Sequence, residues 1–215
     1  MPQKIKISKY HSSRQKRALD LFLGILAIAT LIPLSAIYII LVVVTDQKGS
    51  LFFYQERRGK QGKGFEIIKF RTMRVNSEKE RFNKSLLKLN ISDGPTFKIP
   101  NDPRYTKIGK FLAKSGLDEL PQVLNVIKGE MSFVGPRPLP IFEANKLTEY
   151  QKQRELILPG ITSSWVVSGS HRLRFNQWMS LDLNYVKDAT LLTDLSITFS
   201  TLMLTLKVLF GRLMR

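Results

Sequence analysis

Residues 21–45 read LFLGILAIATLIPLSAIYIILVVVT and contain no charged side chain. At about 1.5 Å per residue, a helix of this length can cross a hydrocarbon core of roughly 30 Å. The run also exceeds the apolar region of a cleaved signal peptide, which has roughly 7–15 residues. A buried helix of a soluble protein is the alternative, but helices of globular proteins usually span roughly 8–20 residues. The run therefore predicts membrane attachment.

Pro33 lies in the middle of this run, where a proline removes a helical hydrogen bond and the nearby Ser35 can offer a substitute. Membrane-flanking segments rich in Lys and Arg usually stay in the cytoplasm, so both ends are predicted to be cytoplasmic. We therefore expect a re-entrant helix that breaks near Pro33 and Ser35, with a kinked spanning helix as the alternative. The flanking basic residues are Lys4, Lys6, Lys9, Arg14, Lys16 and Arg17 before the run, and Lys48, Arg57, Arg58, Lys60 and Lys63 after it.

The composition limits the chemistry. At 215 residues, the chain is long enough for one compact core plus an attachment segment. It has 34 Lys and Arg against 17 Asp and Glu, a formal net charge of +17, so its partners should be anionic: nucleic acid, an anionic membrane or phosphorylated metabolites. Cysteine is absent, which excludes disulfides, thiolate metal ligands and a cysteine nucleophile. With only His11 and His171, a catalytic metal would be a hard ion such as magnesium.

The rest of the chain predicts short elements. Strand-like residues 51–55 and 65–70 flank a turn-rich segment, which indicates a small β-hairpin. Residues 77–90 could form a solvated helix or a mobile loop. Near the end, an amphipathic helix is predicted, with Lys207, Arg212 and Arg215 in its last turns, and it could lie in the membrane interface or pack on the core. Its apolar stripe comprises Leu192, Leu195, Phe199, Leu202, Leu206, Leu209 and Leu213.

Residues 115–138 read SGLDELPQVLNVIKGEMSFVGPRP and hold the densest group of candidate functional residues. The spacing of the apolar residues predicts a helix over 117–128, with Pro121 in its first turn and Gly129 as its stop. Asp118 and Glu119 then fall in the first turn, where the helix dipole stabilises carboxylates and attracts phosphate. The alternative is a helix cap followed by a solvated surface acid.

Cations occur on either side of this helix in the sequence. Arg137 lies between two prolines, which would present its guanidinium to a phosphate with little loss of freedom. Lys69, Arg71 and Thr72 supply two cations and a hydroxyl at the end of a predicted strand. A rigid turn and an exposed basic strand edge would explain these features without any function.

At these residues the sequence resembles the bacterial sugar transferases, the monotopic polyprenyl-phosphate phosphoglycosyl transferases, in the small form that has little beyond the catalytic domain. The resemblance covers most of the chain. It includes Lys16-Arg17 with Asp20, QERRG at 55–59, KFRTM at 69–73, DPR at 102–104, LDELPQ at 117–122, MSFVGPRP at 131–138, PGIT at 159–162 and DLNYV at 182–186.

The resemblance implies a two-step reaction. Asp118 would attack the β-phosphorus of a UDP-sugar, release UMP and carry a phosphosugar that polyprenyl phosphate then accepts. Glu119 would help Asp118 and the substrate phosphates to bind magnesium, or would position the nucleophile. The phosphate-binding candidates are Lys69, Arg71, Thr72, Lys114 and Arg137, and Arg104 and Asp182 are further site candidates.

The same resemblance implies an overall organisation. The expected fold is α+β and mainly helical, with a re-entrant helix-break-helix in residues 1–48 and a membrane-associated catalytic domain in residues 49–215. That domain would contain the hairpin and the amphipathic interfacial helices around one core. We expect it on the cytoplasmic face of the bacterial inner membrane, among membrane lipids, with no nucleic acid partner; a homo-oligomer is open.

Three positions depart from the family pattern. Ala113 stands where an arginine is common, Ser163 where glycine is usual, and Ser170 where an arginine often lies. Replacement charge could come from Lys114, Arg172 or Arg174. The rival interpretations are a non-catalytic membrane-tethered basic scaffold and an anion-binding module. Galactose, glucose and N-acetylated sugars are all open as the sugar transferred, as is the glycan pathway.

Overall fold

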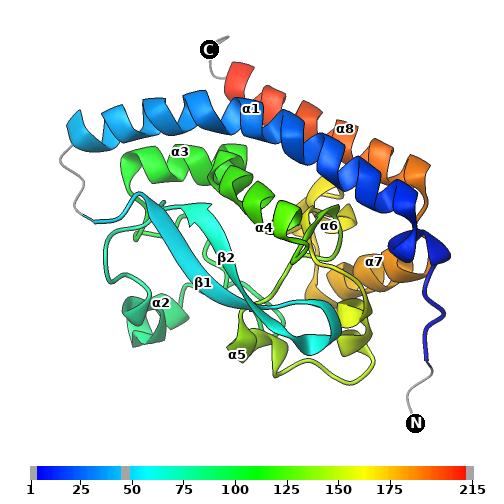
Figure 1. Ribbon diagram of the computed structural model, residues 1–215. Helices are drawn as coiled ribbons and strands as arrows, with labels where there is room; N and C mark the ends of the chain where they lie inside the picture. The colour runs from blue at the N-terminus through cyan, green and yellow to red at the C-terminus, as the bar shows by residue number, and fades with distance from the viewer. Residues whose placement is uncertain (1–3, 45–48, 212–215) are drawn as a thin grey trace.

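The computed structural model of the chain describes residues 4–44 and 49–211 (Figure 1). Two long apolar helices, α1 (Arg14–Val44) and α8 (Leu191–Phe210), run along one side of the molecule. The hairpin of β1 (Phe52–Arg58) and β2 (Gly64–Phe70) lies on the other side, with α3 (Lys107–Ser115) and α4 (Val123–Lys128) between it and α1. The mainly helical α+β prediction is therefore confirmed. The predicted domain boundary at residue 48 lies outside the described residues.

The remaining elements are short, apart from one longer helix, α7. Residues 77–90, expected as one helix or a loop, form two separate turns of helix, η3 (Lys79–Phe82) and α2 (Lys84–Leu87). These remaining elements are η1 (Lys9–Ser12), η2 (Lys60–Gly62), η3 (Lys79–Phe82), α2 (Lys84–Leu87), η4 (Leu117–Gln122), β3 (Ser132–Val134), α5 (Ile141–Ala144), η5 (Gln151–Leu156), β4 (Gly160–Thr162), α6 (Ser164–Val167), η6 (Ser170–Arg172) and α7 (Phe175–Asp188).

Helix α1 continues through Pro33 instead of breaking there. A proline inside a helix removes one backbone hydrogen bond, and here the turns on both sides of it pack against the protein. In the first half, a Cβ added to Gly24 would lie 3.5 Å from the side chain of Val123. In the second half, the buried Tyr38 donates its hydroxyl to the carbonyl of Arg71. Both halves of α1 thus contact the same core, while the re-entrant path through a membrane stays a prediction.

A buried ion cluster fixes the first turns of α1. Lys16 Nζ lies 2.5 Å from Asp194 Oδ2 of α8 and 3.4 Å from Asp20 Oδ1. Tyr10 and Tyr185 donate their hydroxyls to Asp194 at 3.0 and 2.5 Å. We call these five residues the anchor cluster. Because Tyr185 belongs to α7, the cluster joins α1, α7 and α8.

Arg17, the next residue of α1, ties this helix to α4. Its guanidinium donates to the carbonyls of Val126 and Ile127 at 2.7 and 2.9 Å. These carbonyls lie in the last turn of α4, where a cation interacts favourably with the helix dipole. Arg17 therefore caps the helix that directly follows η4.

The predicted hairpin is confirmed, with a longer first strand than expected. Strands β1 and β2 are antiparallel and pair Phe53 with Lys69 and Arg58 with Gly64. The aromatic ring of Phe70 is buried against Tyr38 and Phe52, with ring centroids 4.9 and 5.6 Å away. This packing fixes the end of β2, where Lys69 lies.

A second, parallel pair of strands was not predicted. Ser132 of β3 pairs with Gly160 of β4, and Val134 pairs with Thr162. The two backbone segments approach so closely that a Cβ added to Gly160 would lie 2.0 Å from the nitrogen of Gly135. Glycine is required at this contact, which fixes the start of the 135–138 turn.

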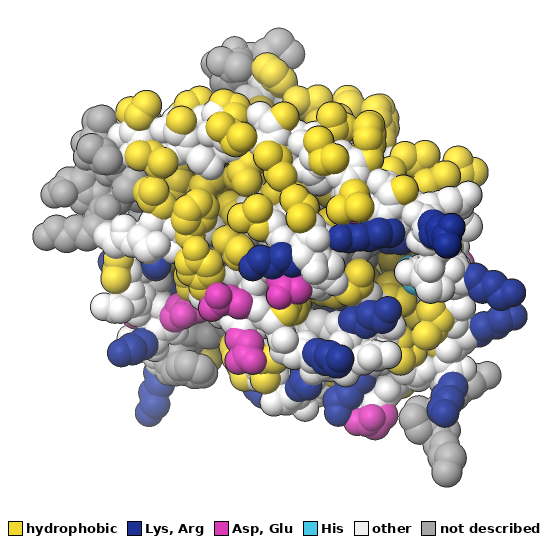
Figure 2. Space-filling view, in the orientation of Figure 1, with side chains coloured by type: hydrophobic (Ala, Val, Ile, Leu, Met, Phe, Trp, Pro, Cys, Tyr) yellow, Lys and Arg dark blue, Asp and Glu magenta, His cyan; other side chains and the backbone are white. Residues whose placement is uncertain are grey.

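The outer face of α1 and α8 is apolar, as the space-filling view shows (Figure 2). Within the described residues, 14–40 and 191–210 are long and apolar enough to cross a membrane. The predicted C-terminal helix is confirmed up to Phe210, and Arg212, Leu213 and Arg215 lie outside the described residues. The exposed side chains include Phe22, Ile25, Leu26, Ile32, Ile37, Ile39 and Ile40 on α1, and Leu192, Leu195, Phe199, Leu202, Met203, Leu204 and Phe210 on α8.

Candidate active site

Asp118 and Glu119 lie in η4, which begins two residues after the last residue of α3. Gly116 makes this junction with a φ of 74°, a left-handed conformation that favours glycine. The helix predicted over 117–128 is confirmed in outline as η4 followed by α4, which ends at Gly129. Its first part is a 3-10 helix instead of an α-helix, and Pro121, which has no N–H to donate, lies inside it.

Glu119 binds two cations that are far away in the sequence. Lys69 Nζ donates to Glu119 Oε1 at 2.7 Å. The guanidinium of Arg137 donates from both terminal nitrogens, to Oε2 at 3.0 Å and to Oε1 at 2.5 Å. Burial alone would raise the pKa of Glu119, but Arg137 and Lys69 hold that pKa well below its usual range. Glu119 is therefore ionised, and it aligns both cations.

Asp118 lies beside this ion pair without joining it. It is only 8 % exposed, and no ion pair in the described part of the chain includes it. Burial raises the pKa of Asp118 to about 7, with a smaller contribution from the negative charge of Glu119 and against the pull of Lys69. The burial of Asp118 and the ion pairs of Glu119 argue against the cap-and-surface alternative. We call Lys69, Asp118, Glu119 and Arg137 the acidic-pair cluster.

Other predicted phosphate-binding residues lie apart from these contacts. Arg71 donates to the backbone carbonyls of Ser50 and Phe52 at 2.7 and 3.3 Å, which secures the start of β1. The carbonyl of Thr72 accepts a hydrogen bond from the amide of Thr106 at 3.0 Å. The side chains of Lys114, Arg172 and Arg174 are exposed and form no ion pair within the described residues.

The two further candidates, Arg104 and Asp182, are both buried in ion pairs. Arg104 Nε lies 2.9 and 3.1 Å from the two carboxylate oxygens of Asp102. Asp182 accepts from Arg154 Nε at 2.8 Å, and Arg154 Nη2 in turn donates to the carbonyl of Arg137 at 2.6 Å. Asp182 is thus connected to the acidic-pair cluster through one intermediate residue.

Sequence reasoning missed Tyr105 and Arg154. Tyr105 forms an isolated antiparallel bridge with Met73, and burial together with the charge of Asp118 raises its pKa to about 12. Its position directly after the DPR motif at 102–104 was the available signal. Arg154 lies in a charged segment with no such signal.

The donor set suits a hard cation that is shared with a substrate. No group of three or more His, Cys, Asp or Glu side chains that could hold a metal occurs within the described residues. Magnesium usually takes one or two carboxylates and fills its other positions with water and substrate phosphates. Asp118 fits that pattern, because it is not paired with a protein cation, whereas both oxygens of Glu119 already accept from Lys69 and Arg137.

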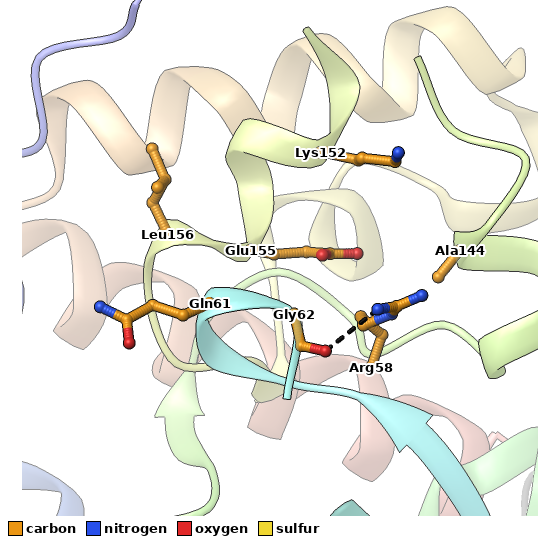
Figure 3. A pocket seen from close by; sticks show the side chains of 7 residues that line it. All are labelled: Arg58, Gln61, Gly62, Ala144, Lys152, Glu155 and Leu156. Atoms are coloured by element: carbon orange, nitrogen blue, oxygen red, sulfur yellow. Dashed lines mark hydrogen bonds between the residues drawn. The ribbon is translucent and has the colours of Figure 1, made fainter. Parts of the chain in front are cut away.

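The structure also has a cavity of about 440 Å³ (Figure 3). It is bounded by the hairpin turn and η5, and Arg58 on its wall donates to the carbonyl of Gly62 at 3.1 Å. None of the acidic-pair cluster lines it. The lining residues are Arg58, Gln61, Gly62, Ala144, Lys152, Glu155 and Leu156.

Comparisons with known proteins agree with the resemblance read from the motifs. The family model described as bacterial sugar transferase matches residues 11–208. The chain is 39% identical to the galactosyl transferase CpsE of Streptococcus agalactiae over 95% of its own length and 44% of that protein. It is 39% identical to the exopolysaccharide production protein ExoY of Sinorhizobium fredii, over 87% of this chain and 83% of ExoY. It is 35% identical to the undecaprenyl-phosphate galactose phosphotransferase of Salmonella typhimurium, over 94% of this chain and 42% of that protein. The chain thus spans less than half of some relatives and most of ExoY.

Proposed function

Because this chain belongs to the bacterial sugar transferase family, we propose that it moves a sugar 1-phosphate from a UDP-sugar to polyprenyl phosphate. The names of the relatives support an undecaprenyl phosphate acceptor and a sugar-phosphate donor. The observation that carries the proposal is that the two acids differ in their ion pairs. Glu119 takes both cations, whereas Asp118 stays buried beside them with no ion pair in the described residues.

Asp118 is the nucleophile of the proposed reaction. One of its carboxylate oxygens forms a bond to the β-phosphorus, the bond from that phosphorus to the bridging oxygen breaks, and UMP leaves with that oxygen. An oxygen of polyprenyl phosphate then bonds to the same phosphorus, and the bond to Asp118 breaks. The carboxylate is restored, and the product is a polyprenyl diphosphate sugar. Two easier steps replace one difficult transfer.

Lys69 and Arg137 bind and neutralise the transferring phosphoryl group in this proposal. Glu119 holds both cations within one hydrogen bond of the acidic pair before any substrate arrives. Such preorganised charge lowers the barrier because little rearrangement is needed during the reaction. Magnesium, held by Asp118 together with the substrate phosphates, would supply further positive charge to the diphosphate.

The apolar faces of α1 and α8 are proposed to lie in the cytoplasmic leaflet of the inner membrane. Two contacts support placing both ends of α1 on one side of the bilayer: Arg17 binds α4 near one end, and Tyr38 binds the carbonyl of Arg71 near the other. A helix held to one core at both ends keeps both ends on the same side of a bilayer. The acidic-pair cluster then faces the polyprenyl phosphate carrier at the membrane surface.

The proposal is tested by measuring UMP release in detergent micelles that contain undecaprenyl phosphate and magnesium. A panel of UDP-galactose, UDP-glucose and their N-acetylated forms is compared for the parent and for Asp118→Asn. We expect UMP and a lipid-linked sugar with at least one donor in the parent, and neither in the variant. With the donor alone, intact-mass spectrometry should detect one phosphosugar on the parent chain. Binding of UDP-sugars without UMP release would instead favour the anion-binding or scaffold alternative.

A further inference from the structure

The two tryptophans of the chain are stacked next to the acidic-pair cluster. Trp165 of α6 and Trp178 of α7 have ring centroids 4.4 Å apart and an interplanar angle of 21°. Phe175 meets Trp178 edge-on at 6.0 Å. Because aromatic contacts of this kind have preferred geometries, each ring restrains the orientation of its neighbour.

Two arginines flank this stack. The guanidinium carbon of Arg137 lies 5.8 Å from the ring centroid of Trp165, and that of Arg154 lies 5.8 Å from the ring centroid of Trp178. Both distances are within the range of a cation–π contact. Arg154 also donates to the carbonyl of Arg137 at 2.6 Å. The contacts from Arg137 through the two tryptophans to Arg154 therefore form a closed ring. Asp182 pairs with the buried Arg154 at 2.7 Å and balances its charge.

Arg137 is therefore held at both its backbone and its side chain. Its carbonyl accepts from Arg154, and the backbone before it is fixed by the β3–β4 contact, where the amide of Gly160 donates to the carbonyl of Pro136 at 3.0 Å. Its guanidinium has Glu119 on one side and Trp165 on another. A long side chain held in this way keeps its planar fork in one orientation.

We propose that Trp165, Trp178, Arg154 and Asp182 form a cradle that positions Arg137 for the transferring phosphoryl group. We call them the arginine cradle. Trp165 and Arg154 act on Arg137 directly, and Trp178 and Asp182 hold those two in place. The inference rests on the proposed function, because it assigns positioning residues to the same reaction. It also gives Asp182 a role: its carboxylate acts through Arg154.

Paired substitutions at Trp165 test the proposal. Trp165→Leu removes the ring over which Arg137 lies, whereas Trp165→Phe keeps an aromatic face. We expect Leu to lower kcat by about tenfold with little change in KM for the UDP-sugar, and Phe to restore kcat to within about threefold of the parent. Tyr150→Leu, which removes an exposed aromatic ring outside the cradle, is the matched control and should behave like the parent.

A double-mutant cycle separates positioning from plain core packing. If Trp165 acts through Arg137, Trp165→Leu should cost less than about threefold when Arg137 is already replaced by lysine. The same tenfold loss in both backgrounds would overturn the proposal, as would equal losses for Trp165→Leu and Trp165→Phe. Thermal unfolding of each variant establishes that the rates refer to folded protein.

A fluorescence measurement does not depend on activity. Trp178→Phe leaves Trp165 as the single tryptophan, and in that background Arg137→Leu should shift its emission because a cation leaves its ring. Unchanged emission would overturn the cradle even if the enzyme is active. Failure of the parent to release UMP from any donor would instead count against the proposed function and leave the fluorescence result to decide on the cradle.

Discussion

The protein has two clusters of charged side chains, which are similar in composition. They differ in whether each carboxylate is paired with a cation. In the anchor cluster, Lys16 contacts both acids, and Asp194 also accepts from two tyrosine hydroxyls. In the acidic-pair cluster, Glu119 receives both cations and Asp118 receives neither. Burial of a carboxylate is common to the two regions. What singles out Asp118 is burial without a protein cation of its own, which costs folding energy and leaves a charge to be used on a ligand.

Asp118→Asn should have the largest effect on the transfer rate. It also separates the role of this carboxylate in the reaction from its cost to stability. We expect the transfer rate to fall by at least about a thousandfold, because an amide cannot act as the nucleophile of the proposed reaction. The same change should raise thermal stability, since it removes an uncompensated buried charge; a gain of about 1 kcal/mol corresponds to roughly 2–4 °C in Tm. UMP release and thermal unfolding in micelles measure both. Asp188→Asn, at an exposed site, is the control, and normal turnover of Asp118→Asn would remove its assigned role.

Arg137→Lys keeps the positive charge and removes the planar guanidinium. Lysine offers a point charge in place of two parallel donors, so a loss of about 2–4 kcal/mol in the transition state should slow transfer by roughly 30- to 1,000-fold. Steady-state kinetics with the preferred donor gives the value. Arg74→Lys tests the same exchange in an exposed ion pair with Glu80, where we expect little change. Equal kinetics for parent and Arg137→Lys would assign Arg137 to structure alone.

Asp194→Asn makes the same exchange in the anchor cluster. It should lower thermal stability, whereas Asp118→Asn should raise it. Removing one partner of a buried ion pair costs about 3 kcal/mol, or roughly 6–12 °C in Tm for a chain of this size. Activity per folded molecule should fall less than it does in Arg137→Lys, because Asp194 lies outside the acidic-pair cluster. Thermal unfolding and initial rates at low temperature provide the test. A more stable Asp194→Asn would erase the distinction between the clusters.

The pH dependence of stability should also report Asp118. Burial raises the pKa of Asp118 from its ordinary value to about 7, so the folded protein holds this proton more tightly than the unfolded chain. The stability linked to the group is present below the unfolded pKa and is lost as pH rises through the folded pKa. The gain of Asp118→Asn over the parent should therefore grow by about 1 kcal/mol or more between pH 4 and pH 7 and then level off. Denaturant titrations of the metal-free proteins measure it, and a constant gap would contradict the raised pKa.

The topology test has the smallest expected effect and concerns the anchor cluster. A spanning α1 would carry Lys16 away from Asp194, whereas a re-entrant α1 keeps the cluster intact. The chain has no cysteine, so Ser12→Cys and Lys60→Cys can be labelled singly. Both should react from the cytoplasmic face. Replacing Pro33 with Leu and Ser35 with Ala should shift some molecules to the spanning state, and only partly, because the basic N-terminal flank resists translocation. Labelling of the parent from opposite faces would refute the re-entrant path.

Local signals predicted the local elements. Turn residues between two strand-like segments located the hairpin, and the spacing of apolar residues located the helix over 117–128 and the C-terminal helix with its stripe from Leu192. The parallel β3–β4 pair escaped because each strand has three residues and the partner lies far along the chain. A contact of that kind leaves no periodic pattern in either segment.

The sequence predicted which residues form the candidate site better than it predicted which of them contact one another. The acidic pair, Lys69 and Arg137 were found from motifs and do lie together. Arg71 and Arg104 look equivalent to these cations in the sequence, yet they bind backbone carbonyls and Asp102 instead. Which acceptor a long side chain meets depends on tertiary packing, and so does the sharing of two cations by one member of an acidic pair.

The cap that Arg17 places on α4 has a consequence for how the protein is made. A ribosome synthesises α1 before α4 and η4, and N-terminal segments begin to fold or insert first. The apolar helix can therefore reach the bilayer while the acidic pair is still unmade. The later helix then completes its hydrogen bonds on an arginine that is already in place. Synthesis in this order makes α1 the surface on which the later helix and the acidic pair are assembled.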